Sequence, residues 1–301
     1  MKPMNTEMHQ FKAPIVDITA IKEITEGVFV IPDSDHTLLV PNIGIIVGSK
    51  ATLVIDTGFG SENARAIIQK AKQLSGGREI FLTHTHCHPE HGFGANVIAG
   101  EVTLLYNGAQ WIELQEKGAT LLQLFRNQIP ALAPMLDGVE FVRPDILYAG
   151  SLLLNLGDRL IVEFVECGGA HSRGDQAIFI RGESSVLFTG DLVEEGYFGI
   201  LGDHESHVIP WIERLKGLER LDPDLVIPGH GHAGERELIT NFQIYFELAK
   251  HRVNEFRAAG KLSESEIVEK VASELLDLHP DWGNRDWAKK TVLDLSWPAR
   301  R

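Results

Sequence analysis

The chain has 301 residues, 44% of them apolar, and a net charge of −14 with the histidines neutral. This length allows one large domain or two small ones with enough apolar residues for a core, and no apolar run is long enough for a membrane span. The acidic charge disfavours a nucleic-acid partner, because a polyanion would be repelled and no Lys/Arg cluster stands out.

The first third of the chain predicts a β-hairpin, a helix and two further strands. Residues 1–20 mix charge with proline, which is unlike a signal peptide and favours a loose or strand-adding N-terminus. The hairpin is expected to turn at Ser49-Lys50, and the helix to be capped by Ser61 and ended by Gly76-Gly77. In chain order the elements are strands at 43–48 and 51–56, a helix at 61–74, and strands at 80–82 and 102–106.

Residues 109–136 are predicted to form a helical insertion with breaks at Pro130 and Pro134, which is either a lid or a packed pair of surface helices. A second β-rich region follows, with a turn at Gly157-Asp158, and the C-terminal part is mostly helical. The expected elements are strands at 151–156, 159–166, 177–180 and 185–189, a helix at 208–220, a strand at 224–228, and helices from residue 234 on.

Two segments share one pattern of strand, turn, strand, and a loop with Asp, Thr and Gly. They are residues 44–58 (GIIVGSKATLVIDTG) and 177–191 (AIFIRGESSVLFTGD). The pattern predicts an α/β protein with two similar β-rich halves, in which two sheets face each other and helices cover the outside. Chance similarity between two hairpins is the alternative.

Residues 83–92 concentrate potential metal ligands directly after a strand. Four histidines and one carboxylate lie within this segment, and packing gives no reason to cluster imidazole, the commonest metal ligand. Alternate residues at a strand end project to one side, so His86 and His88 can reach one metal ion. Glu90 and His91 can then turn to a second ion roughly 3.5–4 Å from the first.

A competing register pairs His84 with His86 and makes His88 the third ligand. That register places Pro89, whose side chain has no ligand atom, where the next ligand should be. The register of His86 and His88 is therefore preferred, and His84 is interpreted as a bystander or as a residue that orients a ligand.

The same segment resembles a known family signature. Residues 85–94 (THCHPEHGFG) are similar to the Thr-His-x-His-x-Asp-His signature of the metallo-β-lactamase superfamily, with its glycine-rich turn. Glu90 departs from that signature, because it stands where the family usually has Asp and its carboxylate reaches one methylene farther. Four further motifs resemble those of the family in the same chain order, namely Asp56-Thr57-Gly58, Gly-Gly-Ala-His171, Phe-Thr-Gly-Asp191 and Ile-Pro-Gly-His230.

This resemblance implies a four-layer αββα sandwich of two mixed β-sheets flanked by helices, as one domain over residues 1–301. The core would span about residues 20–235, with the helical insertion at 109–136 and C-terminal helices at 236–301. The resemblance also implies a centre for two zinc ions, with iron and manganese as alternatives. Its ligands would be His86, His88 and His171 on the first ion, Glu90, His91 and His230 on the second, and Asp191 bridging both with a hydroxide.

Glu90 and Asp191 are the candidate catalytic residues, because either carboxylate can move a proton. Asp56 is interpreted as orienting a ligand histidine or as a plain turn residue, and Asp175 as a turn or cap residue. The segment 193–207 is expected to border the cleft. Its candidate lining residues are Tyr197, His204 and His207, each of which is alternatively a packed or solvated side chain, and the same holds for His36.

The favoured function is a cytoplasmic two-zinc hydrolase that cleaves a small ester, lactone, thioester or amide. The alternatives are an oxidoreductase with one iron, similar to a persulfide dioxygenase, and a non-catalytic metal-binding protein. A small-molecule substrate is expected, without nucleic-acid or membrane partners. Cys87 and Cys167 are interpreted as small buried residues in a reducing compartment. Trp282, Trp287 and Trp297 are expected to pack on the core or to form a homodimer face.

Overall fold

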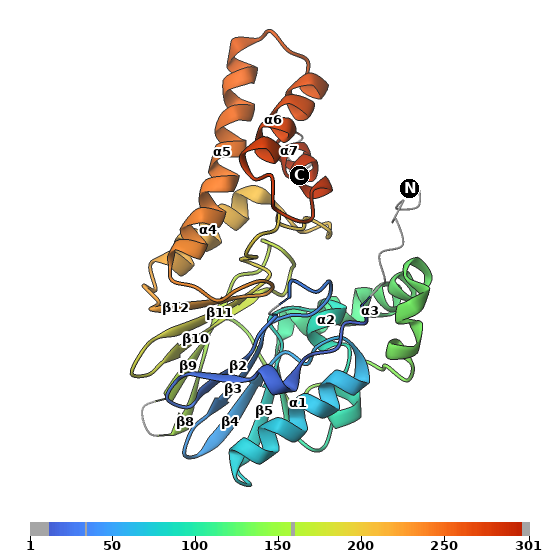
Figure 1. Ribbon diagram of the computed structural model, residues 1–301, viewed down its shortest axis with the longest axis vertical. Helices are drawn as coiled ribbons and strands as arrows, with labels where there is room; N and C mark the ends of the chain where they lie inside the picture. The colour runs from blue at the N-terminus through green and yellow to red at the C-terminus, as the bar shows by residue number, and fades with distance from the viewer. Residues whose placement is uncertain (1–11, 34, 158–159, 297–301) are drawn as a thin grey trace.

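The computed structural model describes residues 12–33, 35–157 and 160–296, and it has two β-sheets between layers of helices (Figure 1). Strands of the first sheet pair antiparallel from β1 to β4 and parallel from β4 to β7. In spatial order they are β1 (Lys22–Thr25), β2 (Val28–Ile31), β3 (Ile43–Val47), β4 (Ala51–Ile55), β5 (Glu79–Thr83), β6 (Thr103–Asn107) and β7 (Ile146–Tyr148).

The second sheet has five strands and is also mixed. Its strands pair antiparallel from β8 to β11, and β12 runs parallel to β11 at the edge. In spatial order they are β12 (Leu225–Pro228), β11 (Val186–Gly190), β10 (Gln176–Arg181), β9 (Leu160–Glu166) and β8 (Leu152–Gly157).

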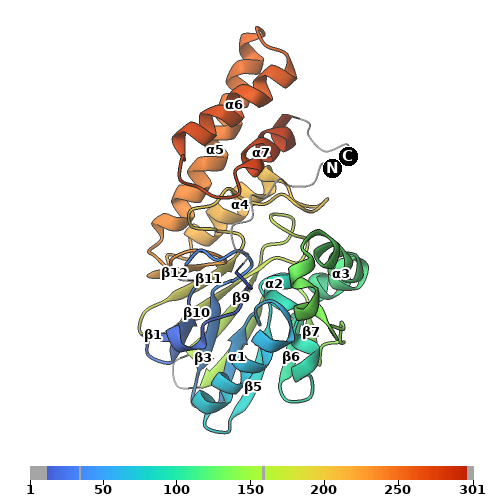
Figure 2. The same cartoon turned by 45° about the vertical axis from the view of Figure 1, so that its right-hand side comes forward.

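Helices cover the outer faces of both sheets (Figures 1 and 2). None of the described helices combines the length and the apolar character that a membrane crossing needs. The α-helices are α1 (Gly60–Ser75), α2 (Pro89–Gly92), α3 (Gly108–Gln128), α4 (Val208–Glu219), α5 (Glu237–Ala259), α6 (Glu264–Leu278) and α7 (Asp286–Ser296). Short 3₁₀ helices are η1 (Ile18–Ala20), η2 (Ala95–Ile98) and η3 (Pro130–Leu136).

Three apolar clusters separate the layers. Leu53 of the first sheet and Phe188 of the second belong to the cluster between the sheets. Alternate residues of a strand face opposite sides, so the neighbouring Val54 packs instead with Ile67 of α1. On the far side, the second sheet shares a cluster with α4 to α7 that includes the fully buried Trp211. These clusters confirm the expected αββα order; the division into one domain remains a prediction.

Two structurally similar units each begin with one of the two hairpins that share a sequence pattern. In the first, β3 and β4 lead through Asp56 to α1, to the parallel strand β5 and to the histidine segment. In the second, β10 and β11 lead through Asp191 to α4, to the parallel strand β12 and to His230. Each unit therefore places an aspartate and a histidine-bearing loop after the ends of two neighbouring parallel strands. Loops in this position meet at one edge of the sheet.

Some expectations about individual elements are wrong. Ser61 does not cap α1, which begins at Gly60 after Phe59 without a side-chain cap. The buried amide of Asn63 fixes this helix start instead, because it donates to the carbonyl of Phe59 at 2.9 Å. Pro134 does not break the chain but lies inside η3. The sequence pattern also missed β1, β2 and β7, which are only three or four residues long.

The helical insertion at 109–136 corresponds to α3 and η3, and Leu132 and Leu136 of η3 are buried against Phe59 and Phe93. These contacts favour the packed alternative over a lid for η3. Gly76 ends α1 in the left-handed region, as expected. The predicted turn at Gly157-Asp158 lies partly outside the described residues, as do residues 1–11 of the expected N-terminal segment.

Two of the C-terminal tryptophans pack on the core. Trp282 and Trp287 are half-buried against the cluster formed with α4 to α7, whereas Trp297 lies outside the described residues. Cys87 and Cys167 are both buried and free. Burial raises the pKa of the Cys167 thiol to about 12, which agrees with its interpretation as a small buried residue.

Candidate metal centre

The histidine segment leaves β5 at its C-terminal end and is anchored from two sides. The side-chain amides of Gln110 in α3 and Gln176 in β10 donate to the carbonyl of His84 at 2.7 Å and 2.6 Å. The backbone N–H of Gln176 donates to the carbonyl of Thr85 at 2.9 Å. A Cβ at Gly190 would lie 2.5 Å from Cβ of Thr85, so only glycine lets β11 approach this segment.

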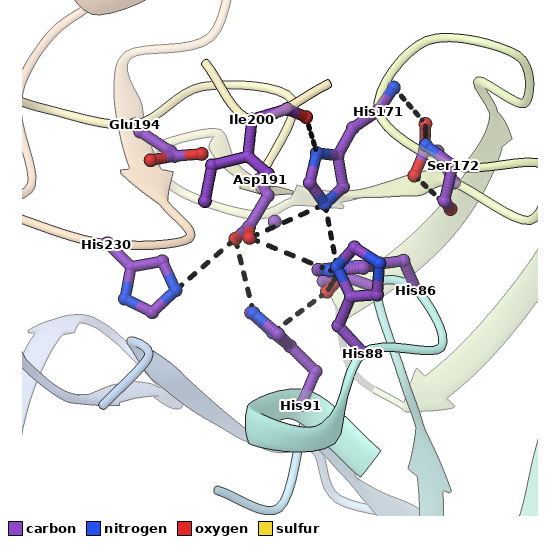
Figure 3. Close-up of polar contacts among 12 residues, drawn as sticks. His86, His88, His91, His171, Ser172, Asp191, Glu194, Ile200 and His230 are labelled. Carbon is purple, nitrogen blue, oxygen red and sulfur yellow. Dashed lines mark hydrogen bonds and ion pairs between the residues drawn. The ribbon is translucent and has the colours of Figure 1, made fainter. Parts of the chain in front are cut away.

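Four side chains form what we term the first donor group: His86, His88, His171 and Asp191. His88 Nδ1 lies 3.1 Å from His86 Nε2 and 2.9 Å from His171 Nε2. Asp191 Oδ2 lies 3.7 Å from Nε2 of both His86 and His171. Figure 3 shows these three imidazoles converging beside the carboxylate of Asp191.

Asp191 also belongs to the second donor group, with Glu90, His91 and His230. Asp191 Oδ1 lies 3.2 Å from His91 Nε2 and 3.7 Å from His230 Nε2 (Figure 3). The two carboxylate oxygens of Asp191 therefore face different donor groups. The seven residues that the family resemblance implied as ligands lie within these two groups, including Glu90 in place of the usual Asp.

The outward-facing ring nitrogens fix the direction of the imidazole lone pairs. His171 Nδ1 donates to the carbonyl of Ile200 at 2.9 Å, and His230 Nδ1 donates to the carbonyl of Val40 at 3.0 Å. His91 Nδ1 lies 2.8 Å from a carboxylate oxygen of Asp56. Because these acceptors require Nδ1–H, each Nε2 presents a lone pair to the centre.

Several of the inward-facing atoms are buried without a hydrogen-bond partner. They are Glu90 Oε2, His91 Nε2 and Asp191 Oδ1. Buried polar atoms normally find a partner, and these atoms are all acceptors that face one another. A bound cation would satisfy all of them, and a set rich in imidazole with two carboxylates suits zinc. The residues present therefore fit a metal centre.

Burial keeps two of the imidazoles in the form that binds metal. It lowers the pKa of His86 well below its usual value and the pKa of His171 to about 4. Burial opposes ionisation of Asp191, but the neighbouring His91 and His230 hold the pKa of its carboxyl well below the usual range. At neutral pH His86 and His171 are thus neutral beside the charged carboxylate of Asp191, whereas Asp191 and Asp56 outweigh burial and raise the pKa of His91.

Two further aspartates hold the ligand loops in place. Asp56, at a φ of +66°, accepts hydrogen bonds from His91 Nδ1, from the backbone N–H of Thr85 at 2.7 Å and from the hydroxyl of Thr85 at 2.9 Å. It therefore orients a ligand histidine, which is the first of its two interpretations. Asp175 accepts the backbone N–H groups of His171 and Ser172, each at 2.7 Å, so it stabilises the turn that carries His171.

Asp203 contacts a ligand histidine and was not predicted from the sequence. Its Oδ2 lies 3.4 Å from His88 Nε2, and its Oδ1 lies 3.5 Å from Nζ of Lys117 in α3. Lys117 also pairs with Glu113 at 2.8 Å and Glu205 at 2.6 Å. The helical insertion is thus tied to the loop that contacts a ligand histidine. The neighbouring His204 drew attention in the sequence because of its residue type, and Asp203 offered no comparable signal.

The other predicted lining residues belong to neither donor group, although Tyr197 lines a small pocket beside Glu90 and His230 of the second one. His84 is buried beside Tyr106, with 3.4 Å between His84 Nε2 and the tyrosine hydroxyl, so the register that uses His84 as a ligand is wrong. The Tyr197 hydroxyl donates to the carbonyl of His36 at 3.2 Å. His204 is exposed, and His207 Nδ1 lies 2.9 Å from Asp294 of α7.

A third group of potential ligands lies nearer the surface. Glu195 Oε2 is 2.9 Å from His36 Nε2 and 3.2 Å from His232 Nδ1, and it also accepts the backbone N–H of His232 at 3.1 Å. These hydrogen bonds already satisfy the carboxylate, so the group needs no cation.

Replacing Asp203 with alanine should weaken metal binding, because His88 loses the partner of its Nε2. Loss of such a partner typically costs about 10–100-fold in metal affinity. Competition with a chromophoric chelator measures the change, and His204→Ala is the matched control on the same loop. Equal affinities in Asp203→Ala and wild type would show that Asp203 does not support the centre.

Comparisons with known proteins agree on one family. A model of the metallo-beta-lactamase superfamily matches residues 36–230. The human protein "Acyl-coenzyme A thioesterase MBLAC2" is 25% identical over 240 residues, which is 74% of this chain and 82% of that protein. The protein of the same name from Gallus gallus is 28% identical over 210 residues, covering 63% of this chain and 72% of that protein.

Solved structures share the fold at low sequence identity. A metallo-beta-lactamase from Pontibacter korlensis matches with a TM-score of 0.60 and 17% identity, covering 74% of this chain and 98% of that chain. The inverting sec-alkylsulfatase Pisa1 from Pseudomonas sp. matches with a TM-score of 0.69 and 18% identity, covering 92% of this chain and 49% of that chain. Both likenesses concern the fold.

Proposed function

Because the chain belongs to the metallo-β-lactamase superfamily, we propose that it is a two-metal hydrolase that cleaves a small ester, lactone, thioester or amide. The observation that carries this proposal is the pair of donor groups that share Asp191 and whose inward-facing atoms are buried without partners. A protein that binds no metal would gain nothing from such atoms, since each buried polar atom without a hydrogen-bond partner lowers the stability of the fold.

His86, His88 and His171 would hold the first ion, Glu90, His91 and His230 the second, and Asp191 would contact both. Zinc held by these residues would supply hydroxide near neutral pH and would polarise the scissile group. Asp56 keeps the Nε2 lone pair of His91 directed inward. Asp191 and Glu90 are the carboxylates in position to accept and pass on a proton.

The human and Gallus gallus relatives support a thioester substrate within this class, because both are named as acyl-coenzyme A thioesterases. The complete second donor group of Glu90, His91, Asp191 and His230 supports two ions, which disfavours the alternative with one iron. We further propose a small-molecule substrate, and a reducing, cytoplasmic location that the two free buried cysteines support.

The first test is the metal content of the purified protein by plasma mass spectrometry, followed by turnover assays with ester, thioester, lactone and amide panels. Close to two zinc ions per chain with turnover of one substrate class is the expected result. One iron per chain would favour the oxidoreductase, and a protein that takes up no metal would refute the proposal.

Replacing Glu90 with alanine should leave one ion per chain, because the second donor group loses a carboxylate while the first group is intact. Activity should fall by at least about 100-fold, since one of two cooperating ions is lost. Metal analysis and kcat/KM measure both effects. Glu90→Asp, which restores the residue usual in the superfamily, is the matched control and should keep two ions. Two retained ions in Glu90→Ala would exclude Glu90 as a ligand.

A further inference from the structure

Residues 200–206 contact two histidines of the first donor group. The carbonyl of Ile200 accepts a hydrogen bond from His171 Nδ1 at 2.9 Å (Figure 3), and the hydroxyl of Ser206 donates to the carbonyl of His171. Asp203 Oδ2 lies 3.4 Å from His88 Nε2. This segment therefore holds both imidazoles through the ring nitrogens that point away from the other donors of the group.

The segment 200–206 does not belong to a helix or a strand that would fix its position. It lies in the connection between β11 and α4, and its residues Gly202 and His204 are exposed. Irregular surface segments of this kind open easily unless side chains of neighbouring elements hold them. The position of Asp203 beside His88 therefore depends on contacts from outside the segment.

Lys117 of α3 reaches this segment at two points. Its Nζ lies 2.6 Å from Glu205 Oε2 and 3.5 Å from Asp203 Oδ1. Partial burial opposes the charge of Lys117, but its hydrogen bonds with Glu113 and Glu205 outweigh burial and raise the pKa of the ammonium group. The cation is thus present at neutral pH and attracts the segment at two carboxylates.

Glu113, one helical turn before Lys117, holds the ammonium group in place. Its side chain is fully buried, and Oε1 lies 2.8 Å from Lys117 Nζ. The same carboxylate accepts the backbone N–H groups of Gly174 at 2.9 Å and of Arg173 at 3.3 Å. Both belong to the turn that carries His171. Because residues four apart share a face of a helix, one face of α3 supports this turn and the segment 200–206.

The second donor group is supported by other parts of the chain. His91 Nδ1 contacts Asp56, and His230 Nδ1 donates to the carbonyl of Val40. Among the described residues, the ion pairs of Lys117 join it to the segment 200–206 and to its own helix. The support that Lys117 provides is therefore confined to the side of the first donor group.

From these contacts we propose that Lys117 is a positioning residue of the first metal site, which acts through Asp203 on His88 and touches neither metal nor substrate. This inference rests on the proposed two-metal hydrolase and deepens it. Lys117 holds the segment 200–206 against the centre, so that Asp203 fixes the His88 ring with Nδ1 directed at the first ion. Without Lys117 the segment moves away and the first ion binds more weakly, while the second ion keeps its ligands and their supports.

The test measures the zinc affinity of each site separately, by competition with a chromophoric chelator. Glu90→Ala leaves the first site intact, and His86→Ala leaves the second. In the Glu90→Ala protein, Lys117→Met should weaken zinc binding about tenfold or more, which is the usual cost of losing a group that orients a ligand. In the His86→Ala protein it should leave zinc binding unchanged. Lys117→Arg keeps the cation and should restore the affinity of the first site.

A double-mutant cycle distinguishes positioning from a general loss of stability. If Lys117 acts through Asp203, adding Lys117→Met to Asp203→Ala should cost no further zinc affinity, whereas an independent effect would add to it. Lys117→Met also leaves the buried Glu113 without its cation, which can destabilise the fold. Glu113→Gln combined with Lys117→Met removes both charges and should show the same loss at the first site.

Lys216→Met is the matched control, because Lys216 also pairs with two glutamates, Glu213 at 3.2 Å and Glu247 at 2.9 Å, but lies in α4. It should retain the zinc affinity of both sites. If the wild-type protein holds two ions, an unchanged first site in Lys117→Met would overturn this inference alone, as would full additivity with Asp203→Ala. A wild-type protein that takes up no metal would overturn the proposed function as well.

Discussion

Asp191→Asn is expected to abolish turnover and to leave at most one metal ion per chain. Asp191 is the one residue shared by both donor groups, with Oδ2 facing His86 and His171 and Oδ1 facing His91 and His230. An amide offers one oxygen in place of two and removes the negative charge between the ions. Metal ions supply several kcal/mol of transition-state stabilisation, so kcat/KM should fall by about 10³-fold or more.

The measurements are metal content by plasma mass spectrometry and kcat/KM on the best substrate of the panel. Glu195→Gln is the control, because it removes an acidic group four residues away that belongs to neither donor group. It should retain both ions and wild-type turnover. If Asp191→Asn kept two ions and full activity, Asp191 would not bridge the donor groups and the arrangement of the centre would have to be revised.

Removing the metal should lower the melting temperature of the protein by roughly 10 °C. A metal that binds only the folded chain stabilises it by about 4 kcal/mol when its free concentration is 1,000 times the dissociation constant, and a large domain shifts by about 2–4 °C per kcal/mol. Without metal, His88 Nδ1 stays only 3.1 Å from His86 Nε2 and 2.9 Å from His171 Nε2. Three further acceptor atoms stay buried without partners.

Differential scanning calorimetry with and without a strong chelator measures this shift, and addition of zinc should restore both the melting temperature and turnover. Asp191→Asn serves as the control, because a variant with a damaged centre should respond less to the chelator. A chelator that strips all metal and leaves the melting temperature unchanged would show that the centre does not contribute to stability.

The sequence predicted the elements that are long and strongly patterned. The hairpins 43–56 and 177–189 are apolar runs with clear turns, and the structure confirms them as β3–β4 and β10–β11. The expected pairing of His86 with His88 is confirmed, although both lie beyond the end of β5 at Thr83 and not in the strand whose alternation suggested it. Bringing in His171, Asp191 and His230, which lie far along the chain, required the family resemblance, because no local pattern links residues at that separation.

Other features could not be predicted from the neighbouring residues in the sequence. Asp203 acts through the partner that tertiary structure brings to it, which is His88. Ser61 is the residue type that caps helices, but the backbone at Gly60, with a φ of +80°, starts α1 one residue earlier without a side-chain cap, and the Asn63 amide donates to the carbonyl of Phe59 there. Local propensity is overridden there by a turn that packs against η3.

The two similar units have a consequence for how the chain assembles. One unit contributes His86, His88, Glu90 and His91, and the other contributes Asp191 and His230, joined by His171 from the loop before β10. Neither unit holds a complete ligand set, so bound ions act as reversible cross-links between distant parts of the chain and restrict its unfolded ensemble as a disulfide does. Opening of either unit breaks both cross-links, and metal release therefore reports the cooperative unfolding of the whole sandwich.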